Sequence, residues 1–113
     1  MNYYKFDNEC LKEWTGRFLL SIQVERDVDL LAAQEVISRA KELARALKGC
    51  ELVPRDALKE LHMTKKILRA EIPYLKNGAD EVIKVADEIE FIFDLILLGE
   101  CCEDRVPGVP RII

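Results

Sequence analysis

Glycine and proline are scarce in this chain, which has five Gly and four Pro among its 113 residues. Sheet proteins with many tight turns depend on both, because Gly adopts positive φ angles and Pro presets the first turn position. The scarcity therefore favours helices. Half of the residues are hydrophobic and 34% are charged, a mixture that can bury a core and that disordered chains lack. We expect one helical domain covering residues 1–113.

Targeting and membrane signals are also missing. The first ten residues, MNYYKFDNEC, contain no apolar run of the kind that signal peptides have. No stretch reaches the roughly 18–20 apolar residues that span a bilayer, and the most apolar stretch, residues 89–98, includes Glu90 and Asp94. We therefore expect a cytoplasmic protein that does not enter a membrane.

Patterns that bind metals or cofactors are absent as well. The four cysteines, Cys10, Cys50, Cys101 and Cys102, form no C-x-x-C pair, and His62 is the only histidine. Zinc sites combine several Cys and His side chains, so we expect neither zinc nor another cofactor. Disulfides belong to oxidising compartments, so a cytoplasmic chain is expected to keep its cysteines as reduced thiols.

The chain lacks a cationic excess: 17 Lys and Arg stand against 21 Asp and Glu, a net charge of −4. Binding to DNA or RNA needs a cationic surface, so a nucleic acid is not the expected partner. The charge is also uneven. Residues 54–77 carry six Lys or Arg and three Asp or Glu, a net of +3, whereas residues 78–113 carry three and nine, a net of −6.

Apolar residues recur at three- and four-residue spacing in four segments, which predicts four amphipathic helices. Asp27 and Asp29 are both possible caps for the second helix. Gly49 is a natural end for it, and Gly78 separates the third helix from the fourth. Pro73 predicts a kink or brief break within the third helix. The expected helices cover about residues 8–24, 29–48, 54–75 and 79–99, with Pro54 as the first residue of the third.

These elements predict an all-α fold, a four-helix bundle of the antiparallel, up-down type with an extended C-terminal tail at about residues 100–113. The tight turn at Gly78 should place the third and fourth helices antiparallel, so that their opposite charges attract. Pro107 and Pro110 exclude a helix from the tail.

The fourth helix is amphipathic in its first half and apolar almost all round in its second half. An ordinary core stripe lies on one side, and further apolar residues lie on the opposite side among the acids. A helix that is apolar all round is buried on all sides. The extra face could be covered by another helix of the chain, by the tail through Val106, Val109 and Ile112, or by a partner or a second copy of the chain. The predicted partner-binding residues are Phe91, Asp94, Leu95 and Leu98, with Asp87 and Glu88 beside them.

Arg55 and His62 are the strongest pattern for catalysis. Six residues separate them, Asp56 follows the Arg, and both are expected on one helix face. This eight-residue pattern resembles the R-x(4–6)-H signature of HEPN-type ribonucleases, which are small all-helical dimers. The resemblance implies that Arg55 and His62 act on the phosphodiester of RNA. A surface histidine beside lysines explains the same pattern without chemistry.

Other catalytic signatures are missing. Pyrophosphohydrolases of the MazG type hold Mg²⁺ with carboxylates three residues apart on a helix, whereas Glu90 and Asp94 are four apart. There is no Gly-rich phosphate loop and no nucleophile motif. By elimination, the expected function is protein binding: a small acidic cytoplasmic module, such as an inhibitor, immunity protein or antitoxin, rather than an enzyme. A structural homodimer and the ribonuclease are the alternatives.

Overall fold

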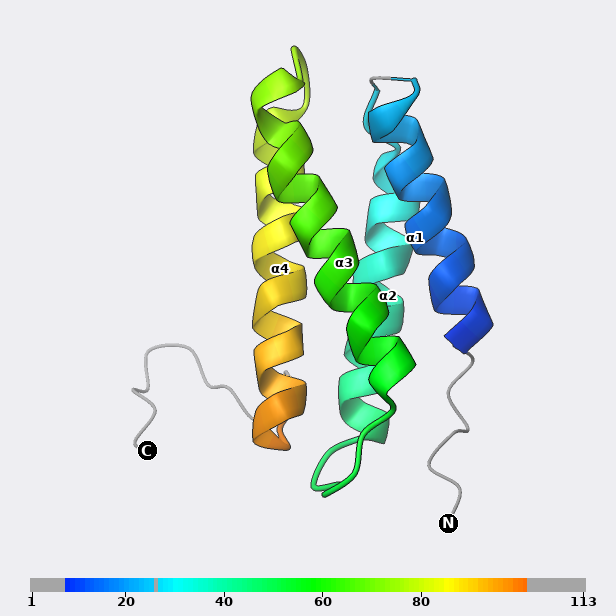
Figure 1. Cartoon of the computed structure of the whole chain (residues 1–113), viewed down its shortest axis with the longest axis vertical. Coiled ribbons are helices and arrows are strands. Elements are labelled where there is room, and N and C mark those ends of the chain that lie inside the picture. Colours follow the sequence, from blue (N-terminus) through cyan, green and yellow to red (C-terminus); the bar gives the residue numbers. More distant parts are fainter. Residues whose placement is uncertain (1–7, 26, 102–113) are drawn as a thin grey trace.

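The structure is a computed structural model that describes residues 8–25 and 27–101. Its elements are α1 (Asn8–Gln23), α2 (Leu30–Ala46), α3 (Arg55–Glu71), a 3₁₀ helix η1 (Ile72–Tyr74) and α4 (Ala79–Leu98). The described segments contain no strand. The four helices run alternately up and down and pack side by side (Figure 1). The predicted all-α bundle is therefore confirmed, while the predicted tail lies almost wholly outside the described residues.

The helix boundaries follow the signals in the sequence. Asp29 is the N-cap of α2, and its Oδ1 accepts a hydrogen bond of 3.0 Å from the Ala32 N–H, as capping residues do. Pro73 lies in η1, so the third helix tightens into a 3₁₀ turn there instead of continuing. Pro54 is the N-cap of α3 and Arg55 its first residue, so the predicted start was wrong by one position.

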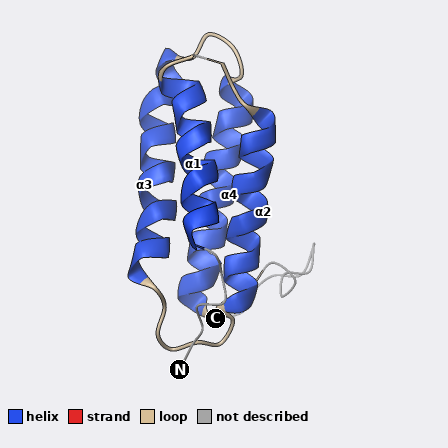
Figure 2. Cartoon of the chain, turned by 90° about the vertical axis from the view of Figure 1, so that its right-hand side faces the viewer, coloured by secondary structure: helices blue, strands red, loops and turns tan. Residues whose placement is uncertain are grey.

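The order of the helices around the bundle departs from a simple sequential ring. α1 packs against α2 and α3, and α4 packs against α2 and α3. Figure 2, turned by 90° from Figure 1, shows α1 nearest the viewer with α3 and α2 on either side and α4 behind. The bundle thus consists of two antiparallel hairpins, α1–α2 and α3–α4, packed side by side. The link from α2 to α3 runs across a diagonal, and the neighbouring helices α2 and α4 are parallel.

The core is aliphatic except for Phe18 and draws on all four helices. Its fully buried large side chains include Leu11, Phe18 and Ile22 from α1, Val36 and Leu43 from α2, Leu61 and Leu68 from α3, and Val82, Ile89 and Ile92 from α4. Each helix therefore contributes one stripe to a shared interior, as amphipathic packing requires. None of the helices in the described part of the chain is long and apolar enough to cross a membrane.

Glycines in the left-handed region close both ends of the bundle. At one end, Gly78 has a φ of 78° and precedes α4, and Val28 from the α1–α2 link lies directly against it. At the other end, the Gly49 N–H donates a hydrogen bond of 3.1 Å to the Gly99 carbonyl. Both residues have positive φ angles there, which Gly adopts without the steric cost of a Cβ atom. These contacts join the α1–α2 hairpin to the α3–α4 hairpin at both ends.

Candidate functional site

The predicted second apolar face of α4 is divided in the structure. Leu95 is 0% exposed and belongs to the interior of the chain. Phe91 and Leu98 are 40% and 48% exposed. Leu97, which was not among the predicted site residues, is 60% exposed. The surface-forming apolar residues at the end of α4 are therefore Phe91, Leu97 and Leu98, without Leu95.

Asp94 is exposed and lies on the same outer side of α4 as these three residues. At 100° per residue, positions 91, 94, 97 and 98 fall within about 120° of one another. We name the set Phe91, Asp94, Leu97 and Leu98 the α4 patch. Asp94 forms no ion pair with any residue that the structure describes. The α4 patch thus combines a solvated carboxylate with exposed apolar side chains.

Two hollows border the α4 patch. One, of about 320 Å³, is lined by Lys84, Asp87, Glu88 and Phe91. The other, of about 280 Å³, is lined by Leu97, Leu98 and the α2–α3 link at residues 49–51, together with Gly99. Both hollows are wide open to solvent. The patch is therefore flanked on two sides by depressions that could receive side chains of a partner.

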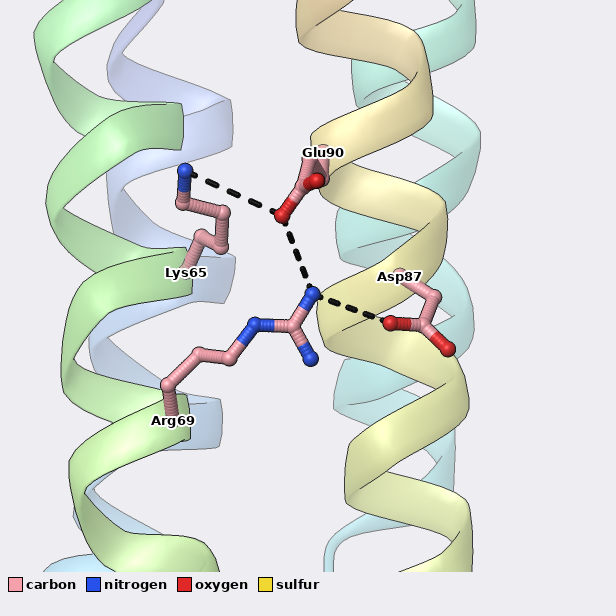
Figure 3. Close-up of polar contacts among 4 residues, drawn as sticks. All are labelled: Lys65, Arg69, Asp87 and Glu90. Carbon is pink, nitrogen blue, oxygen red and sulfur yellow. Dashed lines mark hydrogen bonds and ion pairs between the residues drawn. The ribbon is translucent and has the colours of Figure 1, made fainter.

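Asp87, a predicted partner-binding residue, is engaged within the chain. Arg69 of α3 donates from Nη2 to Asp87 Oδ1 at 2.9 Å and to Glu90 Oε1 at 3.0 Å. The Nζ atom of Lys65 lies 3.9 Å from the same Glu90 oxygen (Figure 3). The hydrogen bonds to Glu90 and then to Asp87 raise the pKa of Arg69 above its ordinary value. The predicted attraction between the third and fourth helices is thus present as an α3–α4 ion-pair cluster.

The cluster predicts a modest, salt-dependent contribution to stability. Arg69→Met should lower the free energy of unfolding by about 0.5–1 kcal/mol, because exposed ion pairs contribute little individually. The loss should shrink at about 1 M NaCl, where the Debye length is about 3 Å. Urea unfolding at low and high salt measures it. Lys59→Met, an exposed change on the same helix, is the matched control. An equal effect of both variants would contradict the prediction.

Glu88 lies at the border between two surfaces. Its exposed side chain lines the hollow beside Phe91 and also a larger groove between α2 and α4. It forms no ion pair with a residue in the described segments. The predicted acids therefore differ in their roles: Asp87 is held by Arg69, whereas Glu88 and Asp94 are available to a partner.

Arg55 and His62 are both exposed on α3. Arg55 is the first residue of the helix, and two helical turns, about 10 Å, separate it from His62. The imidazole of His62 lies beside Phe93 of α4, with 6.0 Å between the ring centroids. Ribonuclease chemistry would require Arg55 and His62 to converge with the same residues of a second chain. The ribonuclease assignment stays a prediction.

The described residues contain no group of three or more His, Cys, Asp or Glu side chains that could hold a metal ion. Cys10, Cys50 and Cys101 form no disulfide with another described residue. Cys102 lies outside the described residues.

Comparison with known proteins gave no match to a family model, a curated protein or a solved structure.

Proposed function

We propose that this protein is a binding module that docks, through the α4 patch, on a basic and partly apolar segment of another protein. The supporting observation is the solvated carboxylate of Asp94 amid the exposed side chains of Leu97 and Leu98. Interfaces typically join an apolar centre to a polar rim that steers the partner. The α4 patch has both parts on one helix.

Charge defines the partner's chemistry. Residues 79–98 carry six Asp or Glu and one Lys, a net of −5. Asp87 and Glu90 are paired with Arg69, so the surplus negative charge lies with the remaining acids, including Glu88 and Asp94. A segment with Lys or Arg beside aliphatic or aromatic residues would satisfy both the acids and the leucines. Oppositely charged surfaces associate faster, and the gain falls with ionic strength.

The small size and the acidic surface suit an inhibitor, immunity protein or antitoxin that masks a cationic surface of its target in the cytoplasm. In this proposal the protein works by occupying its target and performs no chemistry of its own. Full burial of an aliphatic side chain contributes about 1.5–3 kcal/mol, so Leu97 and Leu98 together can supply a substantial part of the binding free energy.

The test is affinity capture from lysate of the native host, followed by mass spectrometry and titration calorimetry with the partner found. Leu97→Gln with Leu98→Gln should weaken binding by about 30-fold or more, because it removes both aliphatic anchors and leaves the charge unchanged. Asp94→Lys should also weaken binding, and the slope of affinity against salt should become shallower.

The matched control is Leu20→Gln with Leu31→Gln, which makes the same change at exposed leucines of α1 and α2. It should leave the partner bound. Circular dichroism establishes that every variant is folded. A partner that binds the patch variant and the control variant equally well would rule out the α4 patch as the docking face.

A further inference from the structure

A groove runs between α2 and α4. On α4 it lies about a third of a turn around the helix from the α4 patch. It has a volume of about 470 Å³ and is lined by residues of these two helices alone. Its apolar floor consists of Leu30, Ala33, Ile37 and Val85, and its charged and polar rim of Gln34, Ser38, Lys41, Glu81, Lys84 and Glu88. A second hollow, of about 220 Å³, shares Leu30 and Glu81 with it and extends it to the Gly78 turn.

The rim is balanced in charge, and its charged side chains are unpaired among the residues that the structure describes. Lys41 and Lys84 supply two cations, and Glu81 and Glu88 supply two anions. None of the four forms an ion pair with a residue in the described segments. A surface with both signs of charge around an apolar floor can complement itself, since a cation of one copy can face an anion of the other and the two-fold axis repeats the pair.

We propose that this groove is the interface of a homodimer whose two-fold axis runs along the groove, parallel to α2 and α4. That axis places α2 of one copy on α4 of the partner, with like ends together. Lys41 and Glu88 both line the end of the groove that lies away from the Gly78 turn. Lys41 of each copy then meets the partner's Glu88, and Ile37 packs against the partner's Val85.

Helix charge selects this orientation over the alternative. Residues 30–46 carry three Lys or Arg and two Asp or Glu, a net of +1, whereas residues 79–98 carry a net of −5. An axis perpendicular to the helices would stack α4 on the partner's α4, and two strongly acidic helices would repel each other. The axis along the groove stacks α4 on the cationic α2 instead.

The area of the face places the dimer among small interfaces, which are typically weak. α2 and α4 have 17 and 20 residues, so they are about 25 and 30 Å long, and packed helices lie about 8–10 Å apart. Their joint outer face projects to about 500 Å² per copy, or about 1,000 Å² in the dimer, near the lower limit for a specific interface. The dimer should therefore be reversible, with a dissociation constant in the micromolar range.

The test uses sedimentation velocity on the full chain between about 1 and 500 µM, at low and high salt. The wild type should pass from monomer to dimer over this range, and salt should weaken the dimer. The acidic variant, Lys41→Glu with Lys84→Glu, and the basic variant, Glu81→Lys with Glu88→Lys, should each be folded monomers. Mixed in equal amounts, they should form a heterodimer, because their rims are then complementary. Lys59→Glu, on α3 away from the groove, should leave the dimer intact.

Three results of the sedimentation experiment would overturn the proposal. One is a wild type that stays monomeric throughout. Another is a dimer that survives both sets of charge reversals. The third is a mixture of the two folded variants that fails to pair. A separate experiment distinguishes a second copy in the groove from a segment of the same chain. The thiol introduced by Ser38→Cys should react more slowly with a thiol reagent as the protein concentration rises, as followed by peptide mass spectrometry. Equally slow labelling at every concentration would assign the groove to a segment of the same chain and would also refute the dimer.

Discussion

Phe18→Ala is expected to lower the free energy of unfolding by about 3–5 kcal/mol, the usual cost of truncating a buried aromatic residue. Phe18 lies in the middle of α1 and is fully buried. α1 makes its extensive contacts with α2 and α3 and not with α4, so it depends on few large side chains for its attachment. Because small domains are stable by only about 5–15 kcal/mol, this single change should remove a large fraction of the total.

Urea or thermal unfolding followed by circular dichroism measures the effect. Leu20→Ala is the control, because Leu20 lies two residues further along the same helix and is half exposed. It should change stability by less than about 1 kcal/mol. A Phe18→Ala variant as stable as Leu20→Ala would show that α1 is not anchored as the structure indicates.

Gly78→Ala should destabilise the protein by about 2–4 kcal/mol through two separate causes. Gly78 has a φ of 78°, and an L-residue pays about 1–2 kcal/mol in that region. A Cβ atom there would also lie 2.5 Å from Cγ2 of Val28, and crowding of this kind typically adds about 1–3 kcal/mol.

A double-mutant cycle separates the two causes. Combining Gly78→Ala with Val28→Ala should relieve the crowding and leave the backbone cost. The double variant should therefore be more stable, by about 1 kcal/mol or more, than the sum of the two single effects predicts. Gly16→Ala is the matched control: Gly16 is in the interior of α1 with nothing near its position, and the same substitution there should stabilise by about 0.5–1 kcal/mol. Additive effects of the Val28 and Gly78 changes would contradict the predicted contact.

The helices were predictable because their ends depend on local chemistry. Asp29, Pro73 and Gly78 each act within one turn of the chain, and the structure uses all three as the sequence indicates. The order of the helices around the bundle was not predictable in this way. Both a sequential ring and the diagonal α2–α3 link satisfy the same amphipathic stripes, and only packing between distant segments distinguishes them.

The placement of the predicted site residues on the outer face of α4 was correct for some of them and wrong for others. A helical wheel shows which residues of α4 share a face, but it does not show how far the neighbouring elements reach around the helix. Leu95 was assigned to the outer face and is buried, and Leu97 was not assigned to it and is exposed. Asp87 was assigned to a partner and is bound by Arg69, because the partner of each acid depends on the rotation of α3. Phe91, Asp94 and Leu98 were placed on the surface correctly.

The two-hairpin construction of the bundle has a consequence for how the chain could be divided. Each hairpin is contiguous in sequence, and the only described covalent connection between them is the α2–α3 link, in which Glu51 and Leu52 are exposed. A chain cut between Leu52 and Val53 would yield two fragments, each with a complete antiparallel helix pair whose apolar side is exposed. In the intact chain, each of these sides is covered by the other hairpin. Co-expressed halves should therefore reassemble into the bundle, which makes the protein a natural candidate for a split reporter.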